Sequence, residues 1–387
     1  MGDGTGPRYV IGVDCSTTAT KAVVFDVDGR AVAESRRTFP LSRPRPGWHE
    51  QTARDWWTST RATIAEAASS VDADAIGAIG LTHQRETFVC LDGRDRELRP
   101  AILWLDGRAA EQIARAGTDE VHRLSGKPPD VTPAFYKLLW LAEHEPDALT
   151  SAARVVDVAA YLGHELTGEW RTSWSSADPL GLVDMSTFRW SATLLDAVGL
   201  TEAQLPELVA PGSRLGGLRE DVAGELGLRP GIPVVAGAGD GQCAGLGAGV
   251  TEAGLMYANL GTAVAAGTWS TDYRWSRAFR TLGGPIPGTY TLETLLSSGT
   301  YLVSWFQETF GAPSAEDLDL SAEDVLEAAA SRLGPGADGL MVLPYWNAAQ
   351  TPYWDPHARG AVIGWSGFHP SATSTGPCSR PWPSSSA

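Results

Sequence analysis

Residues 9–26 read YVIGVDCSTTATKAVVFD, and the architecture of the chain can be inferred outward from this segment. An apolar run ends at Asp14, small hydroxyl residues follow, and a second apolar run leads to Asp28 and Gly29. An Asp-Gly pair between alternating apolar runs is a strong signal for a tight turn between antiparallel strands. The segment therefore predicts a β-hairpin and a further strand at the start of an α/β domain.

The α/β pattern continues along the chain. Residues 55–69 have helical periodicity, residues 75–81 read as a strand, and the run FVCLD reads as a shorter strand. Residues 109–166 are rich in helical patterns, with a loop at 128–133. Near Pro233 a second cycle begins, in which PVVAGAGDGQCAGLGAG reads as a strand, a Gly-rich turn and a small-residue helix. Because this cycle resembles the first one, a weak internal repeat is expected.

Length and composition limit the class of protein. A chain of 387 residues exceeds what one hydrophobic core usually supports, so two domains are expected. The formal net charge of -16 and the lack of a basic run argue against nucleic acid and anionic membranes as partners. The four cysteines are scattered and the seven histidines have no metal-ligand spacing, which favours a reducing, cytoplasmic location.

Asp14 is the first candidate functional residue, because it ends an apolar strand. Ser16, Thr17 and Thr18 follow it, with Lys21 beyond them. Backbone N–H groups and hydroxyls at such a turn can hold phosphate oxygens, and a carboxylate at the strand end can hold Mg²⁺. The alternative is an ordinary turn capped by Asp and Ser.

The segment GAGDG at residues 237–241 is more specific. A carboxylate flanked by glycines, between a strand and a helix, lets a substrate approach the backbone closely. Asp240 could then accept the proton of an attacking hydroxyl as a general base. The alternative is a helix N-cap. Gly261 and Thr262 in NLGTAV are either a second phosphate-contacting turn or an ordinary hairpin.

Two polar runs are candidates for a binding site for a polyhydroxylated ligand. HQRET at residues 83–87 follows directly on the strand AIGAIGLT, and its Arg and Glu can bracket neighbouring hydroxyls. The alternative is a solvated loop with a local ion pair. Trp104, Asp106 and Arg108 in ILWLDGR form a comparable cluster.

Taken together, these residues resemble the FGGY carbohydrate kinases, the sugar- and polyol-phosphorylating branch of the actin/hexokinase-like ATPases. The resemblance extends from Tyr9 to about His369, and its motifs occur in the family's order. They include IGVDCSTTATKAVVFD, PGWHEQTARDWW, IGLTHQRETFVCLD, PAILWLDGR, AGAGDGQCAGLGAG, NLGTAV and LPYWNAAQTPYWDPHARGAVIGW.

The resemblance implies an α/β chain with two RNase H-like domains, a cytoplasmic transferase that phosphorylates an alcohol group, and ATP and Mg²⁺ as cofactors. It implies a small sugar or polyol as partner, with a homodimer as a possible assembly. Asp240 corresponds to the catalytic base and Asp14 to the residue near the metal. Phosphate contacts are implied for Ser16, Thr17, Thr18, Lys21, Gly261 and Thr262. Substrate contacts are implied for His83, Gln84, Arg85, Glu86, Trp104, Asp106, Arg108 and Asp240.

The substrate stays open at this point. The QRET run is similar to that of glycerol kinases, and it differs from the Gln-Met-His pattern of many xylulokinases. The ILWLDGR segment is more like that of ketose kinases. A pentulose, a hexulose, glycerol or a tetritol therefore all fit the resemblance.

The last residues depart from the family pattern. Plausible GC-rich codons from Ala372 onward, read in a shifted frame, encode the helical segment HLYRAVLEAVAFE. This predicts a frameshift close to His369 and an incomplete second domain. The predicted division is a sugar-binding domain at 8–236, a partial ATP-binding domain at 237–369 and an out-of-frame, disordered tail at 370–387. The alternative function is then an inactive sugar-binding remnant that lacks the adenosine site.

Overall fold

The computed structural model describes residues 6–261, 263–310, 321–331, 333–346, 348–355 and 357–367. The chain forms two compact units. Unit 1 comprises Met1–Tyr257 and Gly267–Glu293, and unit 2 comprises Ala258–Ala266 and Thr294–Ala387. The predicted domain boundary at residues 236 and 237 stays a prediction.

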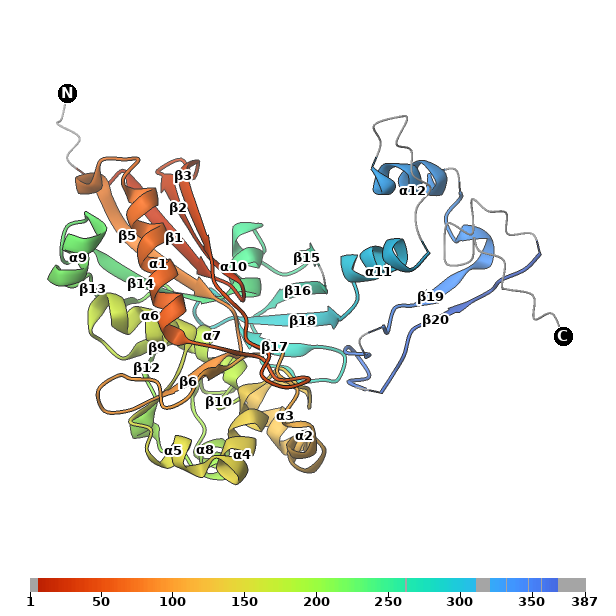
Figure 1. Ribbon diagram of the computed structural model, residues 1–387, viewed down its shortest axis with the longest axis horizontal. Helices are drawn as coiled ribbons and strands as arrows, with labels where there is room; N and C mark the ends of the chain where they lie inside the picture. The colour runs from red at the N-terminus through yellow and green to blue at the C-terminus, as the bar shows by residue number, and fades with distance from the viewer. Residues whose placement is uncertain are drawn as a thin grey trace. The chain divides into compact units, whose positions relative to one another are not determined.

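A six-stranded mixed sheet organises unit 1 (Figure 1). The order of its strands is β13-β14-β5-β1-β2-β3, with β5 parallel to both β1 and β14 and the other pairs antiparallel. The strands are β1 (Tyr9–Cys15), β2 (Ala19–Asp26), β3 (Ala31–Thr38), β5 (Ile76–His83), β13 (Arg214–Gly217) and β14 (Pro233–Gly239). The predicted hairpin is thereby confirmed, together with the third strand that continues from it.

Local chemistry explains the turn of this hairpin. The Asp26 carboxylate accepts hydrogen bonds from the backbone N–H groups of Asp28 and Arg30, both at 2.9 Å. Gly29 has φ of 79°, in the left-handed region that glycine adopts without steric cost. The Asp-Gly pair thus closes the turn between β2 and β3.

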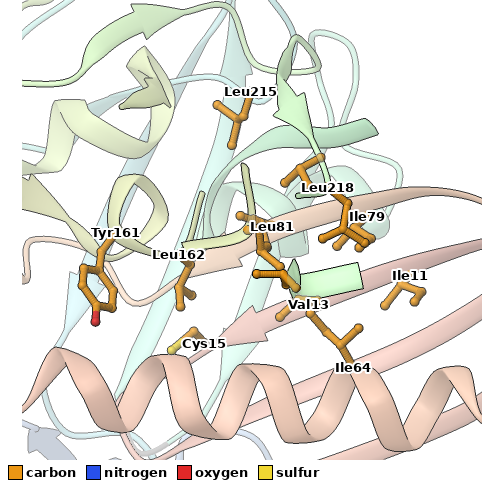
Figure 2. Close-up of a cluster of buried hydrophobic side chains, with 14 of the residues drawn as sticks. Ile11, Val13, Cys15, Ile64, Ile79, Leu81, Tyr161, Leu162, Leu215 and Leu218 are labelled. Carbon is orange, nitrogen blue, oxygen red and sulfur yellow. The ribbon is translucent and has the colours of Figure 1, made fainter. Parts of the chain in front are cut away.

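Helix α1 (Ala53–Ala68) covers one face of the sheet (Figure 1). Its bounds are close to those of the helix predicted at residues 55–69. Its N-cap is Thr52, whose hydroxyl accepts from the Asp55 N–H. The buried side of α1 contributes Trp56 and Ile64 to the main hydrophobic core. Figure 2 shows Ile64 between the helix and the strands, near Val13. Burial of such aliphatic side chains stabilises the layer by about 1.5–3 kcal/mol each.

Unit 1 has a second core that includes Phe88, Tyr136 and Leu138. The predicted helix-rich region is confirmed, although it also contains a strand, β8. The helices are α2 (Ala110–Ala116), α3 (Asp119–Ser125), α4 (Ala134–His144), α5 (Pro146–Thr150), α6 (Val158–Thr167), α7 (Trp174–Ala177), α8 (Ala192–Val198), α9 (Glu220–Leu226) and α10 (Asp240–Gly247). Helices α4 and α8 contribute to this second core, whereas α6 and α9 contribute to the first. The short strands are β4 (Glu50–Gln51), β6 (Phe88–Leu91), β7 (Ala101–Ile102), β8 (Arg154–Asp157), β9 (Arg171–Ser173), β10 (Val183–Asp184), β11 (Arg189–Trp190) and β12 (Glu207–Val209).

Another sheet has the strand order β15-β16-β18-β17. Its strands are β15 (Met256–Leu260), β16 (Val264–Ser270), β17 (Arg280–Gly283) and β18 (Tyr290–Leu296). Strand β17 lies wholly in unit 1. Unit 2 contains α11 (Thr300–Phe310), α12 (Ala322–Ala330), β19 (Met341–Leu343) and β20 (Ala361–Ile363). Within the described part of the chain, no helix is both long and apolar enough to cross a bilayer.

The predicted Gly-rich turn between β14 and the next helix is wrong, since β14 runs directly into α10. An irregularity in the pairing of β14 with β5 between Ala236 and Gly239 takes its place. A Cβ on Gly237 would lie 2.1 Å from the carbonyl oxygen of Leu81. The glycine therefore permits the close approach of two backbones directly before Asp240.

We expect Gly237→Ala to destabilise unit 1 by about 3 kcal/mol, because the new methyl group must displace a backbone carbonyl. The measurement is urea unfolding followed by tryptophan fluorescence. The control is Gly80→Ala on the neighbouring strand β5, where the nearest atom to a new Cβ is the Ile11 carbonyl oxygen at 4.0 Å. Equal stability of the two variants would contradict the proposed close approach.

Candidate active site

Three adjacent parallel strands end at the same edge of the main sheet. Cys15 at the end of β1 and Gly239 at the end of β14 both pair with His83 at the end of β5. The predicted site residues that follow these strands are therefore brought together in unit 1. Carboxyl ends of parallel strands are the usual location of ligand sites in α/β sheets.

Asp240 is the first residue of α10, and one of its carboxylate oxygens is held by two neighbouring groups. Its Oδ1 accepts from the N–H of Gly241 at 2.7 Å and pairs with Nε of Arg85 at 3.0 Å. The side chain is still 45% exposed. The carboxylate is thus fixed in orientation and remains accessible to a ligand.

Arg85 links Asp240 to a buried network of charges. Its Nη1 lies 3.1 Å from each carboxylate oxygen of Glu293, a fully buried residue on β18. Glu293 also accepts from Nε of Arg280 at 2.7 Å and from the hydroxyl of Tyr257 at 2.9 Å. Burial raises the pKa of Glu293, but the charges of Arg280 and Arg85 outweigh burial and lower it to about 2.

Arg280 connects Glu293 to Glu86. Nη1 of Arg280 lies 2.5 Å from Glu86 Oε1, and both side chains are buried. Glu86 has φ of 62°, a left-handed conformation that costs a non-glycine residue about 1–3 kcal/mol. The ion pair to Arg280 holds Glu86 in this conformation, directly beside Arg85. The predicted Arg–Glu pair is therefore part of a buried network and not of a solvated loop.

The glycines on either side of Asp240 leave room for the side chain of Arg85. A Cβ on Gly239 would lie 2.4 Å from Cγ of Arg85, and one on Gly241 would lie 3.0 Å from Oε1 of Glu293. The sequence predicts that these glycines let a substrate approach the backbone. In the structure the arginine side chain fills that space, so the glycines allow the network to form.

Asp14 has the properties of a cation ligand. Its Oδ1 is buried and has no hydrogen-bond partner among the described residues. Burial, reinforced by the nearby charge of Asp240 and opposed by Lys21, raises the pKa of Asp14 to about 6. Two carboxylates that repel each other, one with a free buried oxygen, fit a divalent cation that takes its remaining ligands from phosphates and water. The described residues contain no cluster of three or more metal-binding side chains.

The turn after β1 is held by side chains from two other segments. The carbonyl oxygen of Thr17 accepts from Nε2 of Gln51 at 2.6 Å, and its hydroxyl accepts from the indole N–H of Trp104 at 3.0 Å. Ser16 uses its hydroxyl within the turn, as a donor to the carbonyl of Ala19. Thr18 is exposed. Lys21 forms an exposed ion pair with Glu34 at 2.9 Å.

His83 and Gln84 are both buried at the end of β5. Nδ1 of His83 lies 2.7 Å from the carbonyl oxygen of Gln84, while Nε2 has no partner among the described residues. Nε2 of Gln84 donates to Oε1 of Gln51 at 3.3 Å. Since Gln51 also holds Thr17, it connects the predicted acceptor residues with the turn after β1.

Asp106 and Arg108 form a bidentate ion pair with each other. Nε and Nη2 of Arg108 lie 2.8 Å from the two oxygens of Asp106, and Nη2 also lies 2.7 Å from Glu50. Both side chains are fully buried. Arg108 stacks on the ring of Trp48 at 3.8 Å. These contacts hold the segment that carries Trp104, and the predicted contact with the acceptor stays a prediction.

Gly261 belongs to unit 2, and Thr262 lies outside the described residues. The carbonyl oxygen of Gly261 accepts from the N–H of Thr300 at 2.9 Å. A Cβ on Gly299 would lie 2.4 Å from the same oxygen, so Gly261 is part of a closely packed backbone crossing.

Several members of the site were not predicted from the sequence. Arg280 on β17 and Glu293 on β18 are cross-strand partners, and Gln51 lies on the short strand β4. One signal was available for Glu293, since a lone acidic residue interrupts the apolar strand YTLETLL. A charge in such a strand indicates a buried pair, but it does not identify the partner.

Two family models match most of the chain. A sequence model of the N-terminal domain of the FGGY family of carbohydrate kinases matches residues 9–247, and one of the C-terminal domain matches residues 256–373. The xylulose kinase of Bacillus subtilis (strain 168) is 31% identical over 372 residues, which cover 94% of this chain and 72% of the relative. The gluconokinase of the same organism is 26% identical, with 93% of this chain and 72% of the relative covered.

A solved structure shows the same fold. The crystal structure of xylulose kinase from Rhodospirillum rubrum superimposes with a TM-score of 0.88 at 28% identity, covering 95% of this chain and 75% of that one. The predicted α/β fold of the actin/hexokinase-like ATPases is thus confirmed.

The predicted truncation is not supported. The C-terminal family match continues to residue 373, beyond the frameshift that the sequence suggested near His369. His369 and the tail at 370–387 lie outside the described residues.

We expect Glu293→Gln to lower the free energy of unfolding by about 3 kcal/mol, because it leaves two buried guanidinium groups short of one negative charge. Chemical unfolding measures this loss. Glu225→Gln is the matched control, since Glu225 forms an exposed pair with Arg61 that should contribute about 0–1 kcal/mol. A loss for Glu293→Gln no larger than that of the control would show that the network does not stabilise unit 1.

Proposed function

Because this chain belongs to the FGGY family of carbohydrate kinases, we propose that it transfers the γ-phosphoryl group of ATP to a hydroxyl group of a sugar or polyol, with Asp240 as general base. The assignment of Asp240 as the base rests on the orientation of its carboxylate. Arg85 and the N–H of Gly241 fix one carboxylate oxygen, and the side chain remains partly exposed.

In the proposed reaction Asp240 accepts the proton of the acceptor hydroxyl as its oxygen attacks the γ-phosphorus. The bond between the γ-phosphorus and the bridging oxygen then breaks, and ADP leaves with the electron pair. Catalysis of phosphoryl transfer depends mainly on the positioning of the reacting groups and on electrostatic stabilisation. Asp240 therefore contributes through its fixed orientation. Arg85 supplies that orientation, and Glu293 in turn holds Arg85.

On the phosphate side, Asp14 is the proposed ligand of Mg²⁺, which when bound neutralises charge on the transferring phosphates. The free, buried Oδ1 of Asp14 supports this role. Ser16, Thr17, Thr18 and Lys21 are proposed to face the phosphates from the first turn. Gly261 and Thr262 are proposed as the second phosphate turn.

On the acceptor side, we propose that Arg85 and Glu86 orient the substrate hydroxyls, with His83, Gln84 and Trp104 around them. Asp106 and Arg108 would act through the segment of Trp104, since their polar groups bind each other and Glu50. Among the acceptors considered, a ketose and a polyol both remain candidates. The alternative of an inactive sugar-binding remnant depended on the truncation, which the family match does not support.

We expect Asp240→Asn to lower kcat by about 10³-fold, within the range of general-base catalysis, and to leave the acceptor KM within a few-fold. The assay couples ADP release to a spectroscopic signal, over a panel of ketoses and polyols. Asp196→Asn, an exposed change on α8, is the control and should keep the wild-type rate. Retention of more than a tenth of the wild-type kcat by Asp240→Asn would exclude Asp240 as the base.

A further inference from the structure

Lys137 is a buried lysine to which the proposed reaction gives no role. It lies on α4 between the core residues Tyr136 and Leu138, and its side chain is fully buried. A lysine is almost never fully buried unless its charge is paired. Lys127 follows this rule, since its Nζ lies 2.7 Å from Oδ2 of Asp178. Lys137 forms no ion pair with any described residue, so its burial needs another explanation.

The partners of Lys137 are two backbone carbonyl oxygens on different segments. Its Nζ donates to the carbonyl of Trp104 at 3.0 Å and to the carbonyl of Thr132 at 2.7 Å. Within the described part of the chain, neither carbonyl accepts another hydrogen bond. The lysine therefore joins the segment that follows β7 to the loop that precedes α4.

Both segments are also connected to Glu86 in the proposed acceptor site. The N–H of Trp104 donates at 3.2 Å to the hydroxyl of Thr87, the residue after Glu86. On the other segment, Nη1 of Arg280 lies 3.5 Å from the hydroxyl of Thr132 and pairs with Glu86. These contacts form a closed ring that the buried lysine completes.

The other parts of the site are held without this lysine. Thr17 accepts from the indole of Trp104, but its carbonyl oxygen is also held by Gln51. The contacts that orient Asp240 come from Arg85 and from its own helix. Loss of the lysine should therefore weaken acceptor binding more than it weakens ATP binding or slows the chemical step.

We infer that Lys137 is a positioning residue for the acceptor, because its ammonium group holds the segments of Trp104 and Thr132 in the arrangement that binds a sugar or polyol. The inference rests on the proposed function, in which Trp104 lies beside the acceptor. An ammonium group suits this task, since hydrogen bonds from a charged donor are roughly twice as strong as those from a neutral one.

The first test is acceptor binding by Lys137→Met, which keeps a long side chain and removes the donor. The full chain is titrated calorimetrically without ATP, with xylulose, ribitol or gluconate, whichever binds the wild type most tightly. We expect the Kd of the variant to be at least about tenfold higher, because two buried carbonyls lose their partner. In the ADP-release assay, kcat and the KM for ATP should change by less than about threefold.

Leu194→Ala is the matched control. It removes a buried side chain from α8, in the same core as α4, and should lower stability without changing the acceptor Kd. An unchanged Kd in Lys137→Met, or an equal increase in Leu194→Ala, would overturn the inference and leave the proposed function standing. A wild type that binds the acceptor but transfers no phosphoryl group would instead contradict the proposed function. If none of the three compounds binds, the inference fails.

The pH dependence of the wild type is a second test, which needs no variant to fold. Burial lowers the pKa of Lys137 to about 8. The negative charges of Glu86, Asp106 and Asp130 oppose this shift, and the positive charge of Arg108 adds to it. The acceptor Kd should therefore rise about fivefold between about pH 7 and pH 9.5, as the charged hydrogen bonds become neutral ones. A Kd that stays constant over this range would contradict the inference.

A purely structural role gives a different pH dependence. Because the pKa of Lys137 in the folded chain lies below its ordinary value of 10.5, its contribution to stability increases as the pH rises from about 8 toward 10.5. Weaker acceptor binding in a fold that is not destabilised by this group is thus specific to the positioning role. Lys137→Met should lack the rise in Kd with pH, and the same rise in this variant would assign it to another group.

Discussion

The buried carboxylate of Glu293 is the interaction on which the rest of the site depends. It lies where two arginines from distant parts of the chain meet, Arg85 after β5 and Arg280 on β17. Burial of two guanidinium groups is costly without such a partner. Through Arg85 the carboxylate fixes Asp240, and through Arg280 it holds Glu86 in a left-handed conformation. One buried charge thus links the base to the acceptor-binding segment.

Much of the fold could be predicted from local patterns. The hairpin at residues 9–26, the helix near 55–69 and the strand near 75–81 all follow from periodicity and turn chemistry, and the structure confirms them. The sequence also identifies Asp14, Arg85, Glu86 and Asp240, because each lies at the end of an apolar strand or just after it. Parallel strands then bring these ends to one edge of the sheet, which is a consequence of topology.

The partners of these residues could not be predicted, because their contacts join segments far apart in the chain. Arg85 and Glu293 are 208 residues apart, and Arg280 and Glu86 are 194 apart. No local period encodes such a pairing. For the same reason the sequence alone assigns the glycines at 239 and 241 to substrate approach, whereas in the structure Arg85 lies against them. The frameshift inferred from the tail has no support in the family match, which continues to residue 373.

The most direct measurement is a crystal structure with the best acceptor and a non-hydrolysable ATP analogue. The relevant distance joins the attacking hydroxyl oxygen to the Asp240 carboxylate. We predict about 2.6–3.2 Å, with Nε of Arg85 still bound to Oδ1 of Asp240. An acceptor whose nearest hydroxyl lies beyond about 3.5 Å without a bridging water, or an Asp240 detached from Arg85, would contradict it.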